Sequence, residues 1–592
     1  MKSEEPENAL AISGIALCKA FRRTSGDNVQ ALDHVSLKIR HGTLAALVGP
    51  DGSGKTTLLR MAAGLIALDS GKLEVLGINV TADPQQIQSR ISYMPQKFGL
   101  YEDLSVQENL DLYADLHGVP TGAKNLRYAQ LMQMTNLGSF TDRLAGQLSG
   151  GMKQKLGLAC TLVRSPELLL LDEPTVGVDP LSRRELWEII LRLVKEENLT
   201  VLMSTAYLDE ADRCNHAVVL HQGKVLVQGS PGEVRKLANG RVFLVEPPMG
   251  QLARTFQAQC FDDEGIVDAV PEGGLVRLVL QSGSELAPLA GLAAQSTPAR
   301  FEDGFMLLLH QQGNKAEPGS ASTVRHNPPA AEDLRETIIE VQDLVKKFGA
   351  FTAVDHVSFE VCRGEIFGLL GPNGAGKTTT FRMLCGLLSA TAGTLRVAGE
   401  DLRVARASAR QRIGYVAQKF ALYGQLSVIE NLEFFASAYG LRGRRKHDRI
   451  DWALRHFELF QLAKLPSGQL PGGYKQRLAM AAALLHEPEI LFLDEPTSGA
   501  DPLARREFWR RITLFAEEGV TVIVTTHFME EAEYCDHAVI QDAGRLLAKG
   551  TPAEIRLRAG SRGGQRPSME DAFIAIVEQA REKASIVAME AV

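Results

Sequence analysis

Apolar and polar positions alternate along residues 12–17 and again along residues 339–344, as expected for strands with one buried face. Uninterrupted apolar runs, which indicate strands buried on both faces, lie at Leu44–Val48 and Ile366–Leu370. A glycine-rich turn and then a helix-like periodicity follow each of these runs. The succession of buried strand, turn and helix predicts an α/β fold.

The whole pattern occurs twice along the chain. Matched positions in the two copies are a constant number of residues apart, and this spacing is one residue shorter after a single gap. A period this long indicates a duplicated domain and not a solenoid. The matched positions are Lys55 and Lys377, Gln96 and Gln418, Gln154 and Gln476, Asp172 and Asp494, and Thr205 and Thr526.

Between the two copies, strand-like runs at Val242–Val245 and Leu275–Leu280 predict a small α+β appendage. Residues 301–305, Phe-Glu-Asp-Gly-Phe, are echoed by Met-Glu-Asp-Ala-Phe at 569–573, so a shorter helical counterpart is expected after copy two. The expected domains are 1–240 and 338–560 for the two copies, 241–310 for the appendage, 311–337 for a flexible linker and 561–592 for a C-terminal helical extension.

Composition narrows the class of protein. A chain of 592 residues is too long for one core, and a net charge of −7 gives no general attraction to nucleic acid or anionic lipid. The seven cysteines form no C-x-x-C pair, which favours reduced thiols. No run of 18 apolar residues occurs, so we expect no transmembrane helix, and at a membrane another polypeptide would have to span it.

The glycine-rich turns both fit G-x-x-x-x-G-K-[ST], and they precede helices predicted over Leu58–Leu65 and Phe381–Leu388. Glycines let consecutive backbone N–H groups point at phosphate oxygens, and the following helix adds its positive end. The lysine reaches the β- and γ-phosphates, and the first threonine hydroxyl can ligate Mg²⁺. The chain is therefore predicted to bind nucleoside triphosphate twice. The segments are Gly49, Pro50, Asp51, Gly52, Ser53, Gly54, Lys55, Thr56 and Thr57, and Gly371, Pro372, Asn373, Gly374, Ala375, Gly376, Lys377, Thr378 and Thr379.

Further motifs follow in the same order in both copies. A glutamine precedes similar text, Gln-Lys-Phe-x-Leu-Tyr, and a Gly-Gly pair opens a later helix pattern. An apolar strand then ends in Leu-Asp-Glu-Pro, and the carboxyl end of such a strand is where an α/β fold places its chemistry. These residues are Gln96, Ser149, Gly150, Gly151, Asp172 and Glu173 in copy one, and Gln418, Gly472, Gly473, Asp494 and Glu495 in copy two.

This order of motifs resembles the nucleotide-binding domain of the ATP-binding cassette (ABC) family in both copies, and within it the tandem ATPase subunits of ABC-2-type exporters. The resemblance implies ATP and Mg²⁺ as ligands. Mg²⁺ would be held by Asp172 and Asp494, with Thr56, Thr378, Gln96 and Gln418. Glu173 and Glu495 would polarise the attacking water, the two glutamines would sense Mg²⁺ and the γ-phosphate, and His527 would contact the γ-phosphate. Phe21 and Phe348 are either core residues or platforms on which adenine stacks.

The same resemblance implies that the copies face head to tail as an intramolecular pseudo-dimer, each ATP lying between one phosphate loop and the other copy's Gly-Gly helix start. Copy one has Ala206 where copy two has His527, and copy two has Pro471 where copy one has Ser149. Both departures fall in the composite site of Lys55, which predicts that this site is degenerate. Two unrelated changes that happen to coincide are the alternative.

Two function classes remain. One is the ATP-hydrolysing, energy-coupling subunit of an exporter, held by two integral-membrane permease subunits at the cytoplasmic face of the inner membrane. The other is a tandem ATPase acting on ribosomes or nucleic acid, but residues 241–336 hold 13 acidic and 7 basic side chains and no strongly basic helical connector. The exporter is favoured. Its permease contact is expected at two segments that carry Phe98, Tyr101, Phe420 and Tyr423.

Overall fold

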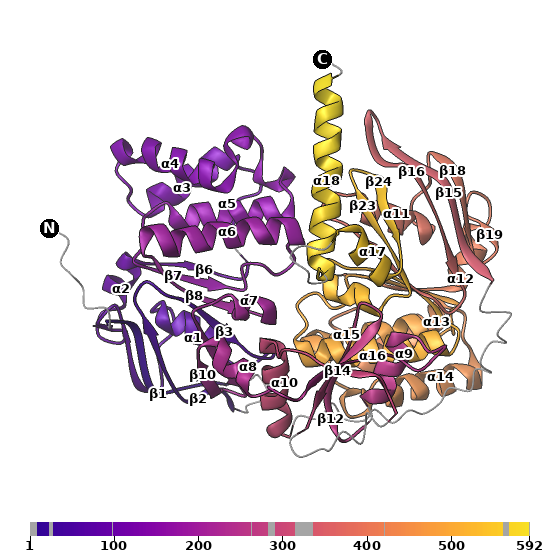
Figure 1. Cartoon of the computed structure of the whole chain (residues 1–592), viewed down its shortest axis with the longest axis horizontal. Helices are drawn as coiled ribbons and strands as arrows, with labels where there is room; N and C mark the ends of the chain where they lie inside the picture. Colours follow the sequence, from indigo (N-terminus) through magenta and orange to yellow (C-terminus); the bar gives the residue numbers. More distant parts are fainter. Residues whose placement is uncertain are drawn as a thin grey trace. The chain divides into compact units, whose positions relative to one another are not determined.

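The computed structural model describes residues 9–22, 28–97, 99–261, 263–281, 291–313, 336–418, 421–560 and 567–590. Its contacts divide the chain into two compact units. The first consists of Met1–Val242 with Ser296–Asn314, and the second of Phe243–Gln295 with Lys315–Val592. In Figure 1, where colour follows the sequence, Met1–Val242 of the first unit runs from indigo to magenta and its Ser296–Asn314 segment has a redder shade, while the second unit runs from magenta to yellow.

Copy one contains a four-stranded antiparallel sheet and a six-stranded sheet. The first has the order β2-β1-β4-β5, formed by β1 (Leu10–Arg22), β2 (Asn28–Arg40), β4 (Ser70–Val75) and β5 (Ile78–Asn79). The second has the order β10-β9-β3-β8-β7-β6, formed by β3 (Leu44–Val48), β6 (Ile91–Met94), β7 (Leu168–Asp172), β8 (Thr200–Thr205), β9 (His216–His221) and β10 (Lys224–Gly229). Strands β6, β7, β8, β3 and β9 are parallel, and β10 is antiparallel to β9.

The helices of copy one connect the strands of the larger sheet (Figure 1). They are α1 (Lys55–Ala62), α2 (Pro84–Arg90), α3 (Val106–Leu116), α4 (Thr121–Thr135), α5 (Gly150–Leu162), α6 (Pro180–Glu197), α7 (Leu208–Asp212) and α8 (Pro231–Lys236), with short 3₁₀ turns at Gly138–Phe140 and Ala145–Gln147. Parallel strands need such long crossovers, which explains the alternation of strand and helix along the sequence.

Copy two repeats this architecture. Its antiparallel sheet has the order β16-β15-β18-β19 and its larger sheet the order β20-β21-β22-β17-β23-β24. The strands are β15 (Thr337–Phe348), β16 (Phe351–Cys362), β17 (Ile366–Leu370), β18 (Ala392–Val397), β19 (Glu400–Asp401), β20 (Ile413–Val416), β21 (Ile490–Asp494), β22 (Thr521–Thr525), β23 (His537–Asp542) and β24 (Arg545–Gly550). The helices are α11 (Lys377–Leu384), α12 (Arg406–Gln411), α13 (Val428–Ala438), α14 (Gly443–His456), α15 (Gly472–Leu484), α16 (Pro502–Glu517), α17 (Pro552–Arg558) and α18 (Met569–Glu590), with 3₁₀ segments at Phe460–Leu462, Ser467–Gln469 and η7 (Met529–Tyr534).

The predicted α/β fold is confirmed, and so are the strands Leu44–Val48 and Ile366–Leu370, which are β3 and β17. All residues of both strands are buried, because helices cover both faces of a parallel sheet. The seven cysteines are in no disulfide in this structure.

The predicted starts of the two helices that follow were wrong. Helix α1 begins at Lys55 and α11 at Lys377, each directly after a glycine in the left-handed conformation, Gly54 with φ 103° and Gly376 with φ 98°. A Cβ on Gly54 would lie 2.4 Å from the carbonyl oxygen of Ala31, so only glycine fits here. The glycine therefore turns the chain straight from phosphate loop into helix, and apolar periodicity alone does not reveal this start.

The appendage forms a four-stranded sheet of order β12-β13-β11-β14, with α9 packed on β12 and β13. Its elements are β11 (Val242–Val245), α9 (Ala253–Cys260), β12 (Ile266–Glu272), β13 (Leu275–Leu280) and β14 (Ala294–Ser296). Its small core includes Phe256, Val276 and Leu278. Although the appendage follows copy one in sequence, most of it belongs to the second unit.

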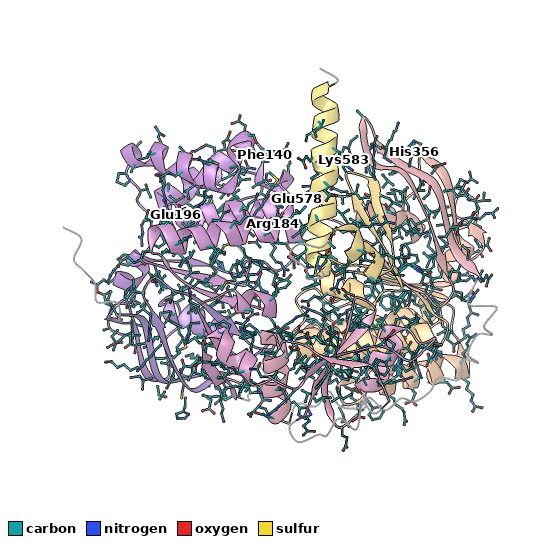
Figure 2. All side chains as sticks on the ribbon, in the orientation of Figure 1. Phe140, Arg184, Glu196, His356, Glu578 and Lys583 are labelled. Carbon is teal, nitrogen blue, oxygen red and sulfur yellow. The ribbon has the colours of Figure 1, made fainter. Side chains whose placement is uncertain are left out.

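The repeated Phe-Glu-Asp and Met-Glu-Asp segments both begin helices. Helix α10 (Phe301–Gln311) packs on α7 and α8 of copy one, and α18 packs on α17 and η7 of copy two. Phe305 and Phe573 are fully buried in these contacts. Figure 2 labels Glu578 and Lys583 along α18, and Arg581 between them donates to both carboxylate oxygens of Asp542 on β23, at 2.8 and 3.1 Å. Among the described helices, none is long and apolar enough to cross a membrane.

Candidate functional site

Each phosphate loop holds its lysine folded back on loop carbonyls. The Lys55 Nζ donates to the oxygens of Gly49 (2.7 Å) and Pro50 (3.2 Å). The Lys377 Nζ does the same with Gly371 (2.5 Å) and Pro372 (2.9 Å). Both lysines are 6% exposed, so each ammonium group is held inside its loop. The phosphate oxygens of a bound nucleotide would compete there with the loop carbonyls to accept its hydrogen bonds.

The carboxylates of copy one lie against the loop and the glutamine. Strand β7 ends at Asp172, which accepts a hydrogen bond from Thr56 Oγ1 at 3.1 Å, and Glu173 follows. The Gln96 Nε2 donates to Glu173 Oε2 at 2.6 Å, and Lys55 Nζ lies 3.9 Å from Glu173 Oε1. The residues of copy one that the sequence predicts to hold Mg²⁺, to polarise the attacking water and to bind phosphate thus lie together.

In copy two the glutamine and the glutamate meet in the same way. The Gln418 Nε2 donates to Glu495 Oε2 at 2.5 Å, and Asp494 ends strand β21. Thr378 follows Lys377 in the first turn of α11. Copy two adds a histidine that copy one lacks, because His527 Nδ1 lies 3.2 Å from Glu495 Oε2.

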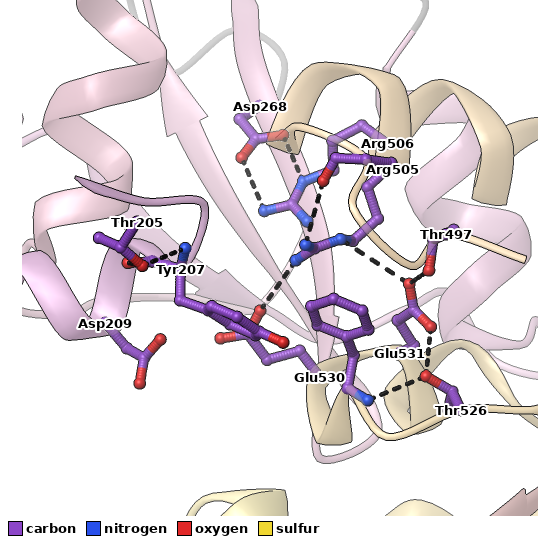
Figure 3. Close-up of polar contacts among 12 residues, drawn as sticks. Thr205, Tyr207, Asp209, Asp268, Thr497, Arg505, Arg506, Thr526, Glu530 and Glu531 are labelled. Atoms are coloured by element: carbon purple, nitrogen blue, oxygen red, sulfur yellow. Dashed lines mark hydrogen bonds and ion pairs between the residues drawn. The ribbon is translucent and has the colours of Figure 1, made fainter. Parts of the chain in front are cut away.

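The segment carrying His527 is fixed by buried polar contacts (Figure 3). The backbone N–H of Phe528 donates to Thr526 Oγ1 at 2.9 Å, and this hydroxyl donates to Glu531 Oε2 at 2.6 Å. The Arg505 guanidinium lies 4.1 Å from the centre of the Phe528 ring and its Nε 3.7 Å from Glu531. The backbone on both sides of His527 is therefore held in place.

The two glutamates differ electrostatically. Burial raises the pKa of Glu173 above its usual value, and the nearby Lys55 only partly offsets it. Burial also acts on Glu495, but the hydrogen bond and charge of His527, with Lys377 and Gln418, outweigh it and lower the pKa. The pKa is therefore raised for Glu173, in the copy with Ala206, and lowered for Glu495, in the copy with His527.

Sequence reasoning missed one pair of residues at this site, Ser204 and Thr525. Each hydroxyl contacts both the aspartate and the glutamate of its copy. The available signal was weak: a hydroxyl residue stands two positions before Ala206 and His527, at the end of a buried strand.

The two Gly-Gly segments begin helices α5 and α15, as predicted. Ser149 caps α5, and its hydroxyl accepts a hydrogen bond from the N–H of Met152 at 3.3 Å. Pro471 precedes α15 without a side-chain cap. The carboxylates of each copy instead face the described threonine, serine, tyrosine, glutamine and histidine side chains of that copy, and Ser149, Gly150, Gly151, Gly472 and Gly473 are not among those partners.

Phe21 and Phe348 are not core residues. They are 42% and 50% exposed, near the ends of β1 and β15, and a lysine ammonium lies over each ring, Lys19 at 5.7 Å and Lys346 at 5.0 Å. Exposed rings leave the stacking role open.

In the segments that carry the predicted permease contact, Tyr101 and Tyr423 are 55% and 51% exposed. Phe98 and Phe420 lie outside the described residues.

The residues fit a nucleotide with Mg²⁺. Within the described part of the chain, the buried Ser53 Oγ in a phosphate loop and the buried His527 Nε2 have no hydrogen-bond partner. Buried polar atoms without partners are costly, so these two indicate groups that a ligand would satisfy. Carboxylate, hydroxyl and amide oxygens beside a loop lysine form a donor set that suits Mg²⁺ and phosphate.

Comparisons with known proteins show which family the sequence matches. The family model described as ABC transporter matches residues 32–176 and 354–498. An Escherichia coli (strain K12) protein, "Probable multidrug ABC transporter ATP-binding protein YbhF", is 48% identical over 566 residues, covering 94% of this chain and 96% of that protein. A "Nod factor export ATP-binding protein I" from Ralstonia nicotianae is 43% identical over 234 residues, covering 39% of this chain and 73% of that protein. A solved structure titled "Structure of ATP binding subunit of ABC transporter" has a TM-score of 0.38 and 33% identity, covering 41% of this chain and 100% of that chain.

Fold and site together define a nucleotide-binding protein with two phosphate-loop domains. The chain belongs to the ABC transporter family: it carries two ABC domains and is an ATPase whose activity is coupled to transport by membrane permease partners.

Proposed function

We propose that the chain is the energy-coupling subunit of an ABC-2-type exporter of a drug or another small molecule. Support comes from the near full-length similarity to a relative named for multidrug transport and from a second relative named for Nod factor export. Both names describe ATP-binding proteins, and this chain carries a phosphate loop, a glutamine and an Asp-Glu pair in both copies.

Each residue at the site has a proposed role. The phosphate loops bind the triphosphate, and Asp172 or Asp494 with its threonine and glutamine holds Mg²⁺, which neutralises phosphate charge when bound. Glu495 orients the attacking water and accepts its proton, and His527 contacts the γ-phosphate through Nε2 while its Nδ1 faces Glu495. Phe21 and Phe348 stack on adenine.

We further propose that the copies act head to tail, with the site of Lys55, Asp172 and Glu173 degenerate. The observation that carries this is the contact of His527 with Glu495, for which copy one offers only Ala206. The opposite Gly-Gly segment of that composite site would carry Pro471, which provides neither a hydroxyl nor a backbone N–H. The site of Lys377 and Glu495 would instead face Ser149.

One chain would serve two integral-membrane permease subunits at the cytoplasmic face of the inner membrane, with no role for nucleic acid. Within it we propose the domain division 1–240, 241–310, 311–337, 338–560 and 561–592. Of the proposed linker, residues 314–335 lie outside the described residues.

Co-purification of the tagged full chain from detergent-solubilised membranes, compared with a ribosome pellet from the same cells, tests this function. We expect two permease subunits per chain in the membrane fraction and no enrichment in the pellet. Two ATPase chains for each permease half would contradict the stoichiometry, and recovery with ribosomes would support the other function class.

A further inference from the structure

The two copies share a hydroxyl that links the aspartate and the glutamate of each site. In copy two, Thr525 Oγ1 donates to Asp494 Oδ1 at 2.7 Å and accepts from the backbone N–H of Glu495 at 3.0 Å. In copy one, Ser204 Oγ donates to Asp172 Oδ1 at 2.7 Å and accepts from the N–H of Glu173 at 2.9 Å. The residue type differs between copies but the two hydrogen bonds do not, so the shared feature is the hydroxyl itself.

The sheet places this hydroxyl. Strands β21 and β22 are parallel neighbours, and Asp494 is the register partner of Thr525, as Asp172 is of Ser204 in β7 and β8. The side chains of register partners point to the same side of a sheet, which brings each hydroxyl to its carboxylate. Thr525 is 1% exposed and Ser204 is 0% exposed, so no bulk water replaces the hydroxyl at either position.

The glutamate that receives this contact has an unusual backbone. Glu495 has φ 45° and Glu173 has φ 50°, in the left-handed region that residues other than glycine rarely adopt. Such a conformation persists only where the surroundings fix it. The N–H of each glutamate points at the hydroxyl and at the carbonyl oxygen of the same residue, Thr525 or Ser204.

A hydroxyl has one proton and two lone pairs. Because the glutamate N–H takes a lone pair, the proton is left for the aspartate, and the two hydrogen bonds orient each other. We propose that Thr525 and Ser204 are positioning residues for ATP hydrolysis: each locks the glutamate backbone to the aspartate, so that the water-orienting carboxylate and the metal-holding carboxylate keep a fixed relative position.

The test removes the hydroxyl from both copies, Ser204→Ala with Thr525→Val, so that the result does not depend on which copy hydrolyses ATP. In the full chain we expect kcat to fall about 10–100-fold, as for loss of a group that orients a ligand, with KM for ATP changed less than about threefold. ATP itself is held by the phosphate loops, which are intact. The exchange Ser204→Thr with Thr525→Ser keeps both hydroxyls and should retain kcat within about threefold.

Thr200→Val with Thr521→Val is the matched control. These buried threonines begin the same two strands, and their hydroxyls accept from the N–H groups of Gly42 and Gly364 at 3.0 Å, far along the strand from the carboxylates. The control should leave kcat unchanged. The proposal is overturned if the hydroxyl-free variant keeps wild-type kcat, if the exchange variant is as slow as the hydroxyl-free one, or if the control loses as much. Each single variant separately reports which copy hydrolyses.

Discussion

His527 and Glu495 face each other: Nδ1 of the imidazole lies 3.2 Å from Oε2 of the carboxylate, and the same oxygen accepts the Gln418 amide. Among the described residues of copy one, the corresponding carboxylate accepts from Gln96 and lies 3.9 Å from Lys55, and Ala206 stands where the histidine would be. The two copies thus hold the same glutamate with different partners.

The first prediction concerns this difference. Glu495→Gln should reduce steady-state ATP hydrolysis about 10²–10⁴-fold, because an amide neither accepts the proton of water nor orients it as a carboxylate does. Glu173→Gln should reduce it much less, since its site lacks the histidine. Phosphate release by the purified full chain measures both. Binding of a fluorescent ATP analogue, expected to be retained in both variants, is the control, and equal losses of hydrolysis would contradict the proposed asymmetry.

Much of this site could be predicted because its motifs are local in sequence. The phosphate loop, the glutamine and the Asp-Glu pair each carry their chemistry in a few consecutive residues, and β3 and β17 have the predicted bounds. Ser204 and Thr525 could not be predicted, because their role depends on which strand lies beside β7 and β21 in the sheet. Strand order is a long-range property that apolar periodicity does not contain.

The sequence also did not predict that the appendage packs with the second unit. This packing depends on side chains far apart in sequence, such as Asp268 with Arg506 and Arg254 with Asp536. A single buried arginine in a sequence does not indicate its partner.

The second prediction concerns the permease contact. Tyr101 and Tyr423 are exposed, yet their backbones are fixed by buried asparagines: Asn109 and Asn431 each bond the tyrosine N–H (3.0 Å) and carbonyl (3.1 Å). Tyr101→Ala with Tyr423→Ala should therefore leave the segments in place but weaken permease association by roughly 2 kcal/mol or more for each anchor. Retention of permease subunits on the tagged chain during detergent washing measures it.

Phe351→Ala is the control for this variant, because Phe351 is 65% exposed on β16 and lies outside both segments. It should retain permease subunits as the wild type does. Normal assembly and export by the double tyrosine variant would place the contact elsewhere.

The third prediction concerns attachment of the appendage. Asp268 on β12 and Arg506 on α16 form an ion pair, Nε to Oδ1 at 3.2 Å, with side chains only 3% and 2% exposed (Figure 3). Asp268→Ala should lower the free energy of unfolding of the second unit by about 3–5 kcal/mol, because a buried guanidinium loses its facing carboxylate. Urea unfolding followed by tryptophan fluorescence measures it, since Trp509 lies on the same helix.

Asp448→Ala provides the comparison. Asp448 faces Arg444 across an exposed pair, with side chains 67% and 94% exposed, and its loss should change stability by less than about 1 kcal/mol. If both aspartate variants unfold at the same urea concentration, the buried pair does not stabilise the unit.

The last prediction concerns acid stability. Burial lowers the pKa of His486 to about 4, with Arg449 also lowering it and the Ile413 carbonyl and Glu487 acting in the opposite direction. The imidazole stacks on Tyr439 with ring centres 3.8 Å apart, and Nε2 lies 3.0 Å from the Ile413 oxygen. The unfolded chain binds a proton near pH 6.5, whereas the folded chain excludes it down to about pH 4. Stability is therefore complete above pH 6.5 and is lost as the pH falls through this window.

Between pH 7.5 and pH 5 the loss from His486 should reach up to about 2 kcal/mol, which thermal unfolding of the full chain at the two pH values can detect. His486→Gln keeps an amide donor for the Ile413 oxygen but does not titrate, so its midpoint temperature should fall less than that of the wild type over the same range. His356→Gln is the control for the exchange itself, because it makes the same substitution at a side chain that is 71% exposed (Figure 2). An unchanged pH dependence in His486→Gln would show that His486 is protonated in the folded state as readily as in the unfolded one.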